Sequence, residues 1–359
     1  MTTIRLRGPA DLLAALPYQL GYHPDDAIVV VSLRQRAVGL VQRLDLPPEE
    51  HLAEACDALL PALERDCPDA VLLVGYEREP GSSLTVLDAV RDACDLADLE
   101  VVDRLVVRDG RWYAPDCESG CCPPDGAPLP TAADTPAVAD FVGLEVAPLR
   151  DRAAVGAQLD RDERRAAEVA DALGAGAAFG LAPVGSGPRS HRAARADRER
   201  WLATWAVVGD VSASRPPVDG LAPDEVAALA RSLRDVELRD AVIAWLCPGT
   251  LPVDTLGEDL AGLVRRALPP AVWGEERPSE LSARAARRLQ ARLVELCRAM
   301  PTGEAAPMLT VLANLTWWMG DGTLTREALG RALALEPDYR LARLLARMVD
   351  LALRPRAAG

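Results

Sequence analysis

The pattern of hydrophobic and polar positions in the first third of the chain predicts a β-sheet. The run 27–33 (AIVVVSL) and the run 37–44 (AVGLVQRL) flank the polar tip 34–36, so we expect them to form a β-hairpin. The run 70–75 (AVLLVG) is continuously apolar, which is typical of a strand buried on both faces. The run 100–108 (EVVDRLVVR) predicts a further strand.

Helices are expected before and between these strands. A short helix over 11–16 precedes the hairpin and is expected to end at Pro17, because proline removes a backbone donor. Two amphipathic helices, over 47–62 and 82–96, connect the later strands. With a return strand after the Asp109-Gly110 turn, the order β–β–α–β–α–β–β predicts an α/β domain with a mixed sheet.

The pattern changes beyond this sheet. Residues 114–135 concentrate Cys, Pro, Gly and Asp without periodicity, which predicts a loop. The segments with helical periodicity that follow are 135–142, 151–159, 162–173, 191–207, 223–246, 280–299, 306–319, 323–335 and 338–353. We therefore expect two domains, an α/β domain over 1–148 that includes the Cys-rich loop, and an all-α helical domain over 149–359.

The last expected hairpin has the residue spacing of a helical repeat. The string WWMGD at 317–321 is followed by Ala328 and by ALALEP at 332–337, which resembles the second part of a tetratricopeptide repeat. No second copy follows at the repeat length of roughly 34 residues. Two interpretations stay open, a single tetratricopeptide-like unit and a helical hairpin with similar packing.

Composition and charge narrow the classes of function. The chain of 359 residues contains no lysine, so all 40 basic residues are arginine. This excludes a Schiff-base lysine, a Walker A lysine and the lysine of a protein kinase. Residues 1–150 contain 12 Arg and 26 Asp or Glu, whereas residues 151–359 contain 28 of each. The acidic N-terminal part repels phosphate backbones and anionic membranes, so we expect neither nucleic acid nor a membrane as partner.

No segment has the pattern of a signal peptide or a membrane span, since no apolar run approaches the roughly 18 residues that a span needs. The eight cysteines are scattered and are expected to be reduced thiols. The sequence therefore predicts a soluble cytoplasmic protein.

The densest polar cluster near the N-terminus is the string GYHPDD, in the loop that enters the first predicted strand. His23 can act as an acid, a base or a ligand, and Asp25 or Asp26 can orient its ring. In the predicted hairpin Arg43 and Asp45 return to the same end and share one face. These groups can form a catalytic site. The alternative is that the charges pair structurally and that His23 is a surface residue.

A second cluster lies in the predicted Cys-rich loop. Cys117, Cys121 and Cys122 place three thiols close together, and these can bind zinc with His23 as a fourth ligand. The spacing has no second Cys-x-x-Cys pair. Loop packing, a reactive thiol and a disulfide therefore stay open as alternatives.

Several specific strings carry a family resemblance, and they are LLAALPYQLGYHPDD (12–26), RLDLP (43–47), CCPPDG (121–126) and WWMGDG (317–322). With the valine-rich strand between the first two, they resemble the actinobacterial family of unknown function numbered 4192. The resemblance covers nearly the full chain and implies no particular activity. It implies that the His23 loop, Arg43 with Asp45, and the Cys-rich loop are the features that a function would use.

Two functions follow from these observations. The first is a non-catalytic protein that binds a protein partner or a small-molecule ligand, which the helical array and the lack of a catalytic signature favour. The second is a hydrolase or lyase in which His23 is the acid or base, Asp25 or Asp26 orients it, and Arg43 holds an anionic substrate. A zinc site in the Cys-rich loop is compatible with both.

Overall fold

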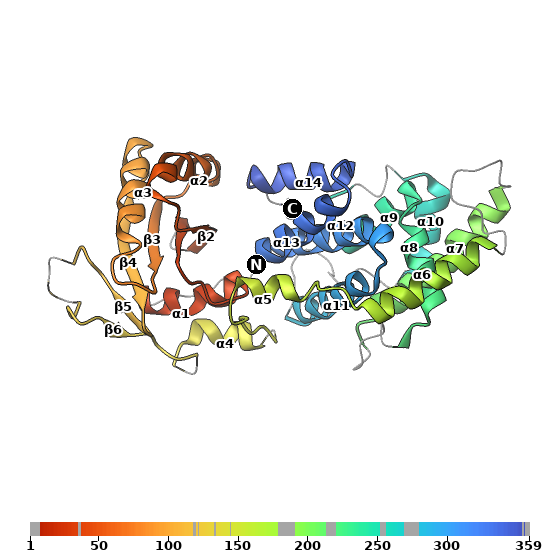
Figure 1. Ribbon diagram of the computed structural model, residues 1–359, viewed down its shortest axis with the longest axis horizontal. Helices are drawn as coiled ribbons and strands as arrows, with labels where there is room; N and C mark the ends of the chain where they lie inside the picture. The colour runs from red at the N-terminus through yellow and green to blue at the C-terminus, as the bar shows by residue number, and fades with distance from the viewer. Residues whose placement is uncertain are drawn as a thin grey trace. The chain divides into compact units, whose positions relative to one another are not determined.

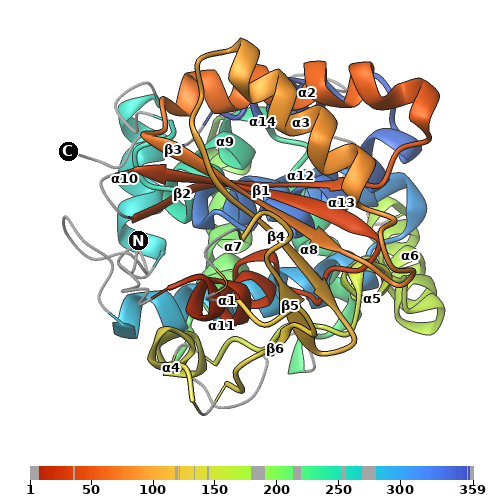
Figure 2. The ribbon, with the colours of Figure 1, turned by 90° about the vertical axis from the view of Figure 1, so that its left-hand side faces the viewer.

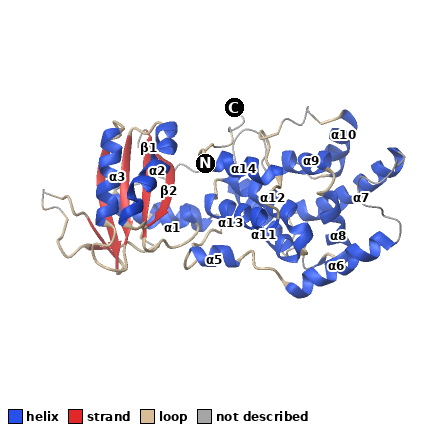
Figure 3. Cartoon of the chain, turned by 45° about the horizontal axis from the view of Figure 1, so that its top comes forward, coloured by secondary structure: helices blue, strands red, loops and turns tan. Residues whose placement is uncertain are grey.

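The computed structural model describes residues 8–34, 37–117, 120, 122–132, 134–143, 145–178, 191–212, 220–251, 256–268, 280–353 and 355. The chain divides into two compact units, Met1–Arg152 and Ala153–Gly359. The described strands all lie in the first unit, and the second unit is built from helices (Figure 3).

A six-stranded mixed sheet forms the centre of the N-terminal unit. Its spatial order is β2 (Ala37–Asp45), β1 (Ala27–Arg34), β3 (Ala70–Tyr76), β4 (Val101–Arg108), β5 (Arg111–Tyr113) and β6 (Ala127–Pro128). Among the described strand pairs, β3–β4 is parallel and the others are antiparallel. The predicted mixed sheet and the β1–β2 hairpin are therefore confirmed. The short strand β6 lies inside the segment for which we expected only a loop.

Helices lie on both sides of this sheet. Helices α2 (Leu52–Asp66) and α3 (Leu84–Leu96) lie on one side, and α1 (Pro9–Leu20) and α4 (Pro136–Gly143) lie on the other (Figures 1 and 2). A short 3-10 helix, η1 (Glu49–His51), precedes α2. Helices therefore cover both faces of the sheet, as expected for the α/β domain that the sequence predicts.

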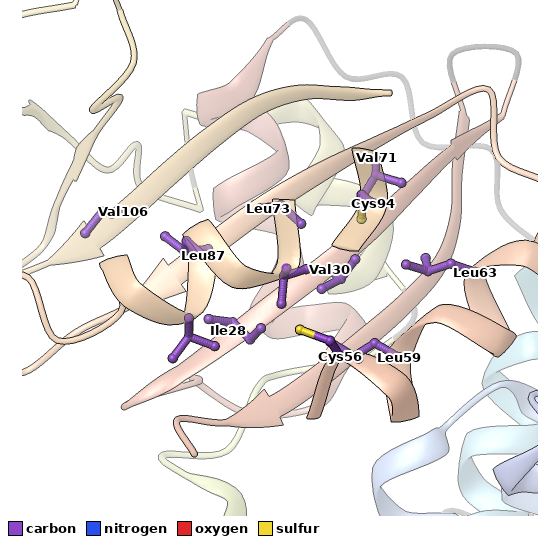
Figure 4. Packing of buried hydrophobic residues seen from close by; sticks show 12 residues of the cluster. Ile28, Val30, Cys56, Leu59, Leu63, Val71, Leu73, Leu87, Cys94 and Val106 are labelled. Atoms are coloured by element: carbon purple, nitrogen blue, oxygen red, sulfur yellow. The ribbon is translucent and has the colours of Figure 1, made fainter. Parts of the chain in front are cut away.

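The alternation along β1 assigns its side chains to two faces. Ile28 and Val30 belong to the hydrophobic cluster beneath α2 and α3, together with Leu63 and Leu87 (Figure 4). Because successive side chains in a strand point to opposite faces, Ala27 and its alternate neighbours face away from that cluster. Ala27 is also fully buried. Burial on both faces explains why residues 27–31 of this strand are all apolar.

Helix α1 differs from the prediction. We expected it to end at Pro17, but it continues through this proline to Leu20. Pro17 is buried together with Leu13 and Leu16, so the packing of this face outweighs the loss of one backbone donor. Gly21 ends the helix instead, in the left-handed conformation with φ 81°.

Helix α5 (Arg152–Ala157) begins at the last residue of the N-terminal unit and continues into the helical unit. The helical unit also contains α6 (Glu163–Ala178), α7 (His191–Gly209), α8 (Pro223–Ser232), α9 (Val236–Leu246), α10 (Glu258–Ala267), α11 (Glu280–Ala299), α12 (Thr302–Met319), α13 (Gly322–Leu335) and α14 (Arg340–Asp350). Helices α12 and α13 pack against each other as a hairpin. Gly320 ends α12 with φ 82°, and the Asp321 carboxylate accepts a hydrogen bond from the amide of Leu324 (3.1 Å). No helix in the described part of the chain is long and apolar enough to cross a membrane.

The observed helices of this unit differ from the predicted ones in several places, and α12, for example, begins at Thr302 and not at 306. The single helix expected over 223–246 is two helices, because the Asp235 side chain accepts a hydrogen bond from the amide of Leu238 (3.2 Å) and starts α9. Helix α6 continues past Gly174, where we expected it to end. Helix α10 was not expected, since its ten residues lie between two Pro-containing segments that resemble loops.

The close contact between β3 and α3 gives a testable prediction. A Cβ on Gly75 would overlap the Ser83 side chain, which is fully buried. Ser83 cannot move away, because its amide and its hydroxyl both donate to the Glu77 carboxylate (3.1 and 2.7 Å). We expect Gly75→Ala to lower the free energy of unfolding by about 1–3 kcal/mol, measured by chemical denaturation.

The matched control is Gly330→Ala, on an exposed part of α13 with open space around the new Cβ. It should raise the free energy of unfolding by about 0.4–1 kcal/mol, because alanine reduces the entropy of the unfolded chain. Equal effects of the two substitutions would contradict the close contact at Gly75.

Candidate functional site

The loop that carries His23 joins α1 to β1, and its backbone is fixed. The His23 amide donates to the Leu149 carbonyl (2.9 Å), and the Leu149 amide donates to the Gly21 carbonyl (2.8 Å). Tyr22, between them, is buried. The His23 side chain itself is exposed. The loop therefore presents the imidazole to solvent.

Asp25 and Asp26 are paired with Arg78, which follows β3. The Arg78 guanidinium forms ion pairs with both carboxylates, and its Nε lies 3.4 Å from Asp26 Oδ2. The Arg78 amide also donates to Asp26 Oδ1 (3.1 Å). Within the described residues, no hydrogen bond or ion pair joins either carboxylate to the His23 side chain. These two carboxylates therefore attach the loop to the end of β3.

Arg43 and Asp45 are brought together on β2. Two residues apart in one strand, they share a face, and Arg43 Nη2 lies 2.5 Å from Asp45 Oδ1. Asp45 also accepts from Arg152 Nη1 (3.3 Å). The Arg43 side chain is 11% exposed, whereas that of Asp45 is 69% exposed. The arginine is thus the buried member of the pair.

The ion pair with Asp45 leaves most of the Arg43 guanidinium without acceptors. Its Nε and Nη1 atoms are buried and have no hydrogen-bond partner in the described part of the chain. A guanidinium has five N–H donors and no way to lose its charge. A buried donor without a partner costs about 1–3 kcal/mol. Arg43 can therefore donate hydrogen bonds from Nε and Nη1 to an additional acceptor.

Two other arginines of the same sheet are matched much better. Arg104, with 9% of its side chain exposed, donates from Nε and Nη2 to the two oxygens of Asp116 (2.6 and 2.5 Å) and also pairs with Asp88. Arg108 donates from Nη1 to the buried carboxylate of Glu77 (2.9 Å). Among the described residues, Arg43 has two buried nitrogens without a partner, whereas Arg104 and Arg108 have none.

The register of the sheet adds Tyr76 to the same face. Ala27 of β1 is paired with Asp45 on one side and with Tyr76 on the other. Val29, two residues along β1, is paired with Arg43. Directly paired residues carry their side chains on the same face. Asp45 and Tyr76 therefore flank Ala27, and Arg43 lies in the next row of that face.

The hydroxyl of Tyr76 is a second unmatched donor. Tyr76 is 6% exposed, and its hydroxyl has no hydrogen-bond partner among the described residues. Burial raises the pKa of Tyr76 well above its usual value, so the group keeps its proton and its capacity to donate. The Oε1 atom of Gln19 in α1 is also buried without a hydrogen-bond partner in the described part of the chain. It is an acceptor, so it is not a further donor for an anion.

Neither Tyr76 nor Arg78 was singled out by the sequence analysis. Tyr76 directly follows the apolar run 70–75 and resembles the end of a buried strand. Its position beside Ala27 depends on the antiparallel pairing of β1 with β3, which are not neighbours in the chain. The register between β1 and β3 is therefore the information needed to place Tyr76 at the site.

The Cys-rich loop is described in part. Cys117 and Cys122 are half-buried, and Cys121 lies outside the described residues. Asp116, at the start of the loop, is held by Arg104, and this hydrogen bond lowers the pKa of the Asp116 carboxyl. Across the described residues, no group of three or more His, Cys, Asp or Glu side chains is arranged to hold a metal ion. A zinc site that includes Cys121 stays a prediction.

The sequence matches the family described as Domain of unknown function (DUF4192) over residues 9–356. The chain belongs to this family. No curated protein and no solved structure matches the chain. The matched range includes Arg43, Asp45 and Tyr76, so the site lies within the part that defines membership in DUF4192.

Burial gives the cysteines different reactivity. It raises the pKa of the Cys94 thiol to about 11 and raises the pKa values of Cys247 and Cys297 further. Cys67, at the end of α2, is exposed. Since the thiolate is the reactive form, we expect iodoacetamide at pH 8 to label Cys67 in the native protein and the three buried thiols only after unfolding. Peptide mass spectrometry measures this, and native labelling of Cys247 or Cys297 would contradict it.

Proposed function

We propose that the chain is a non-catalytic binding protein whose N-terminal unit binds a small anion at Arg43. The observation that supports this function is a buried guanidinium with one carboxylate partner and two nitrogens that lack acceptors. An anion supplies those acceptors, and charge-assisted hydrogen bonds of this kind are among the strongest in proteins. The single carboxylate that pairs with Arg43, that of Asp45, is itself shared with Arg152.

The surroundings of Arg43 favour binding over catalysis. A hydrolase or lyase needs a group that moves a proton within hydrogen-bond distance of its substrate. His23 is the candidate for this role, but its side chain is exposed and neither Asp25 nor Asp26 hydrogen-bonds to it. The pairing of both carboxylates with Arg78 supports a structural role for this loop.

The test uses thermal unfolding of the full chain in potassium acetate, phosphate or sulfate, with ionic strength held constant by potassium chloride. We expect at least one of these anions to raise the unfolding temperature in a saturable way. Arg43→Gln should weaken that binding at least about tenfold, because it removes charge-assisted hydrogen bonds.

Arg150→Gln is the matched control, since the Arg150 side chain is 87% exposed and pairs with its neighbour Asp151. It should bind the anion as the natural chain does. If none of the three anions gives saturable stabilisation, or if Arg43→Gln binds equally well, the proposed function is wrong.

For the helical unit we infer that α12 and α13 form a single tetratricopeptide-like hairpin that contributes to binding a protein partner. The residue spacing of this repeat supports the inference, and so does the full burial of Ala328 and Ala332. Small side chains at these positions let two helices approach closely.

A larger side chain at Ala328 tests this close approach. We expect Ala328→Leu to lower the free energy of unfolding by about 1–3 kcal/mol, because it overfills the contact between the helices. Ala334→Leu, on the exposed side of α13, should change stability by less than about 0.5 kcal/mol. Chemical denaturation compares the two variants, and a neutral Ala328→Leu would argue against a tetratricopeptide-like contact.

A further inference from the structure

We propose that the ligand of the Arg43 site is a small monocarboxylate, bound jointly by the Arg43 guanidinium and the Tyr76 hydroxyl. This inference rests on the proposed function, the binding of an anion at Arg43, and adds the chemical class of that anion. It also assigns to Tyr76 a role in selecting the ligand.

The sheet places the two donors on opposite sides of β1, offset by two residues. Arg43 on β2 is paired with Val29, and Tyr76 on β3 is paired with Ala27. Two strand spacings and this offset put their Cα atoms about 12 Å apart, a distance that the long side chains of arginine and tyrosine can span from both ends. Both carry their donors on the face away from α2 and α3, so one ligand above Ala27 can accept from both.

The carboxylates at this end of the sheet favour a ligand of low negative charge. Asp45 is shared by two arginines, and Asp25 and Asp26 are both paired with Arg78, so three carboxylates lie near three arginines here. A phosphate dianion would place two further negative charges beside Asp45, where repulsion opposes binding, whereas a monocarboxylate places only one.

The two kinds of donor also match a carboxylate. A carboxylate has two oxygens and no donor, so one oxygen can accept from the guanidinium and the other from a neutral hydroxyl. Tyr76 supplies such a hydroxyl, because its burial keeps the phenol protonated. In this arrangement the arginine provides the charge, and the tyrosine orients the ligand.

The experiment measures the stabilisation of the full chain at pH 7.5 by acetate, by its neutral isostere acetamide and by phosphate, at constant ionic strength. We expect acetate to bind more tightly than phosphate, and acetamide to give no saturable stabilisation. Tyr76→Phe keeps the ring and loses the hydroxyl, so we expect it to weaken acetate binding about tenfold. Denaturant unfolding of this variant checks that it is folded.

Tyr113→Phe is the matched control, because Tyr113 lies in the same sheet but packs on the face beneath α2 and α3. It should leave acetate binding unchanged. Tighter Arg43-dependent binding of phosphate than of acetate would overturn the inference and leave the proposed function standing. The same holds if Tyr76→Phe binds acetate as tightly as the natural chain. Absence of Arg43-dependent binding for every anion would overturn both.

Discussion

The compensation of buried positive charge is the constraint on which the N-terminal unit depends. Arg104 pairs with Asp88 and Asp116, and Arg108 pairs with Glu77, and neither arginine has a buried nitrogen without a partner in the described part of the chain. Arg43 satisfies the constraint at one nitrogen only, through Asp45, although it is about as buried as Arg104. Unmatched buried donors destabilise a fold, and a ligand that accepts from them recovers that free energy on binding. The unmatched Arg43 nitrogens thus explain why a ligand can bind here, and their positive charge explains why that ligand is an anion.

The fold concentrates polar chemistry at one end of the sheet. Residues 27–31 of β1 are apolar on both faces, so charged groups are excluded from this stretch and lie beyond its ends, and those of the candidate site lie where β1 begins. The His23 loop enters there, Asp45 ends β2 opposite Ala27, and Tyr76 ends β3 on the other side. Arg78 then ties the loop to β3 through Asp25 and Asp26, which fixes the approach to this end.

Much of this arrangement follows from local sequence pattern. Two apolar runs around a polar tip predict the hairpin, and the alternation of side chains along a strand gives Arg43 and Asp45 a shared face, because both features depend on residues that are close in the chain. Tyr76 and the Arg78 pairs depend on which distant strands meet, and no local pattern specifies that. The helix through Pro17 was missed for a related reason, since tertiary packing there outweighs the preference of one residue. The split between α8 and α9 was missed because a single capping carboxylate, Asp235, decides it.

The most direct measurement is a crystal structure of the full chain grown in sodium acetate. The account predicts a carboxylate within hydrogen-bond distance of Arg43 Nε or Nη1 and of the Tyr76 hydroxyl, above Ala27. It would be contradicted by a structure in which protein carbonyl or carboxylate groups accept from both donors, because no acceptor would then be needed from a ligand.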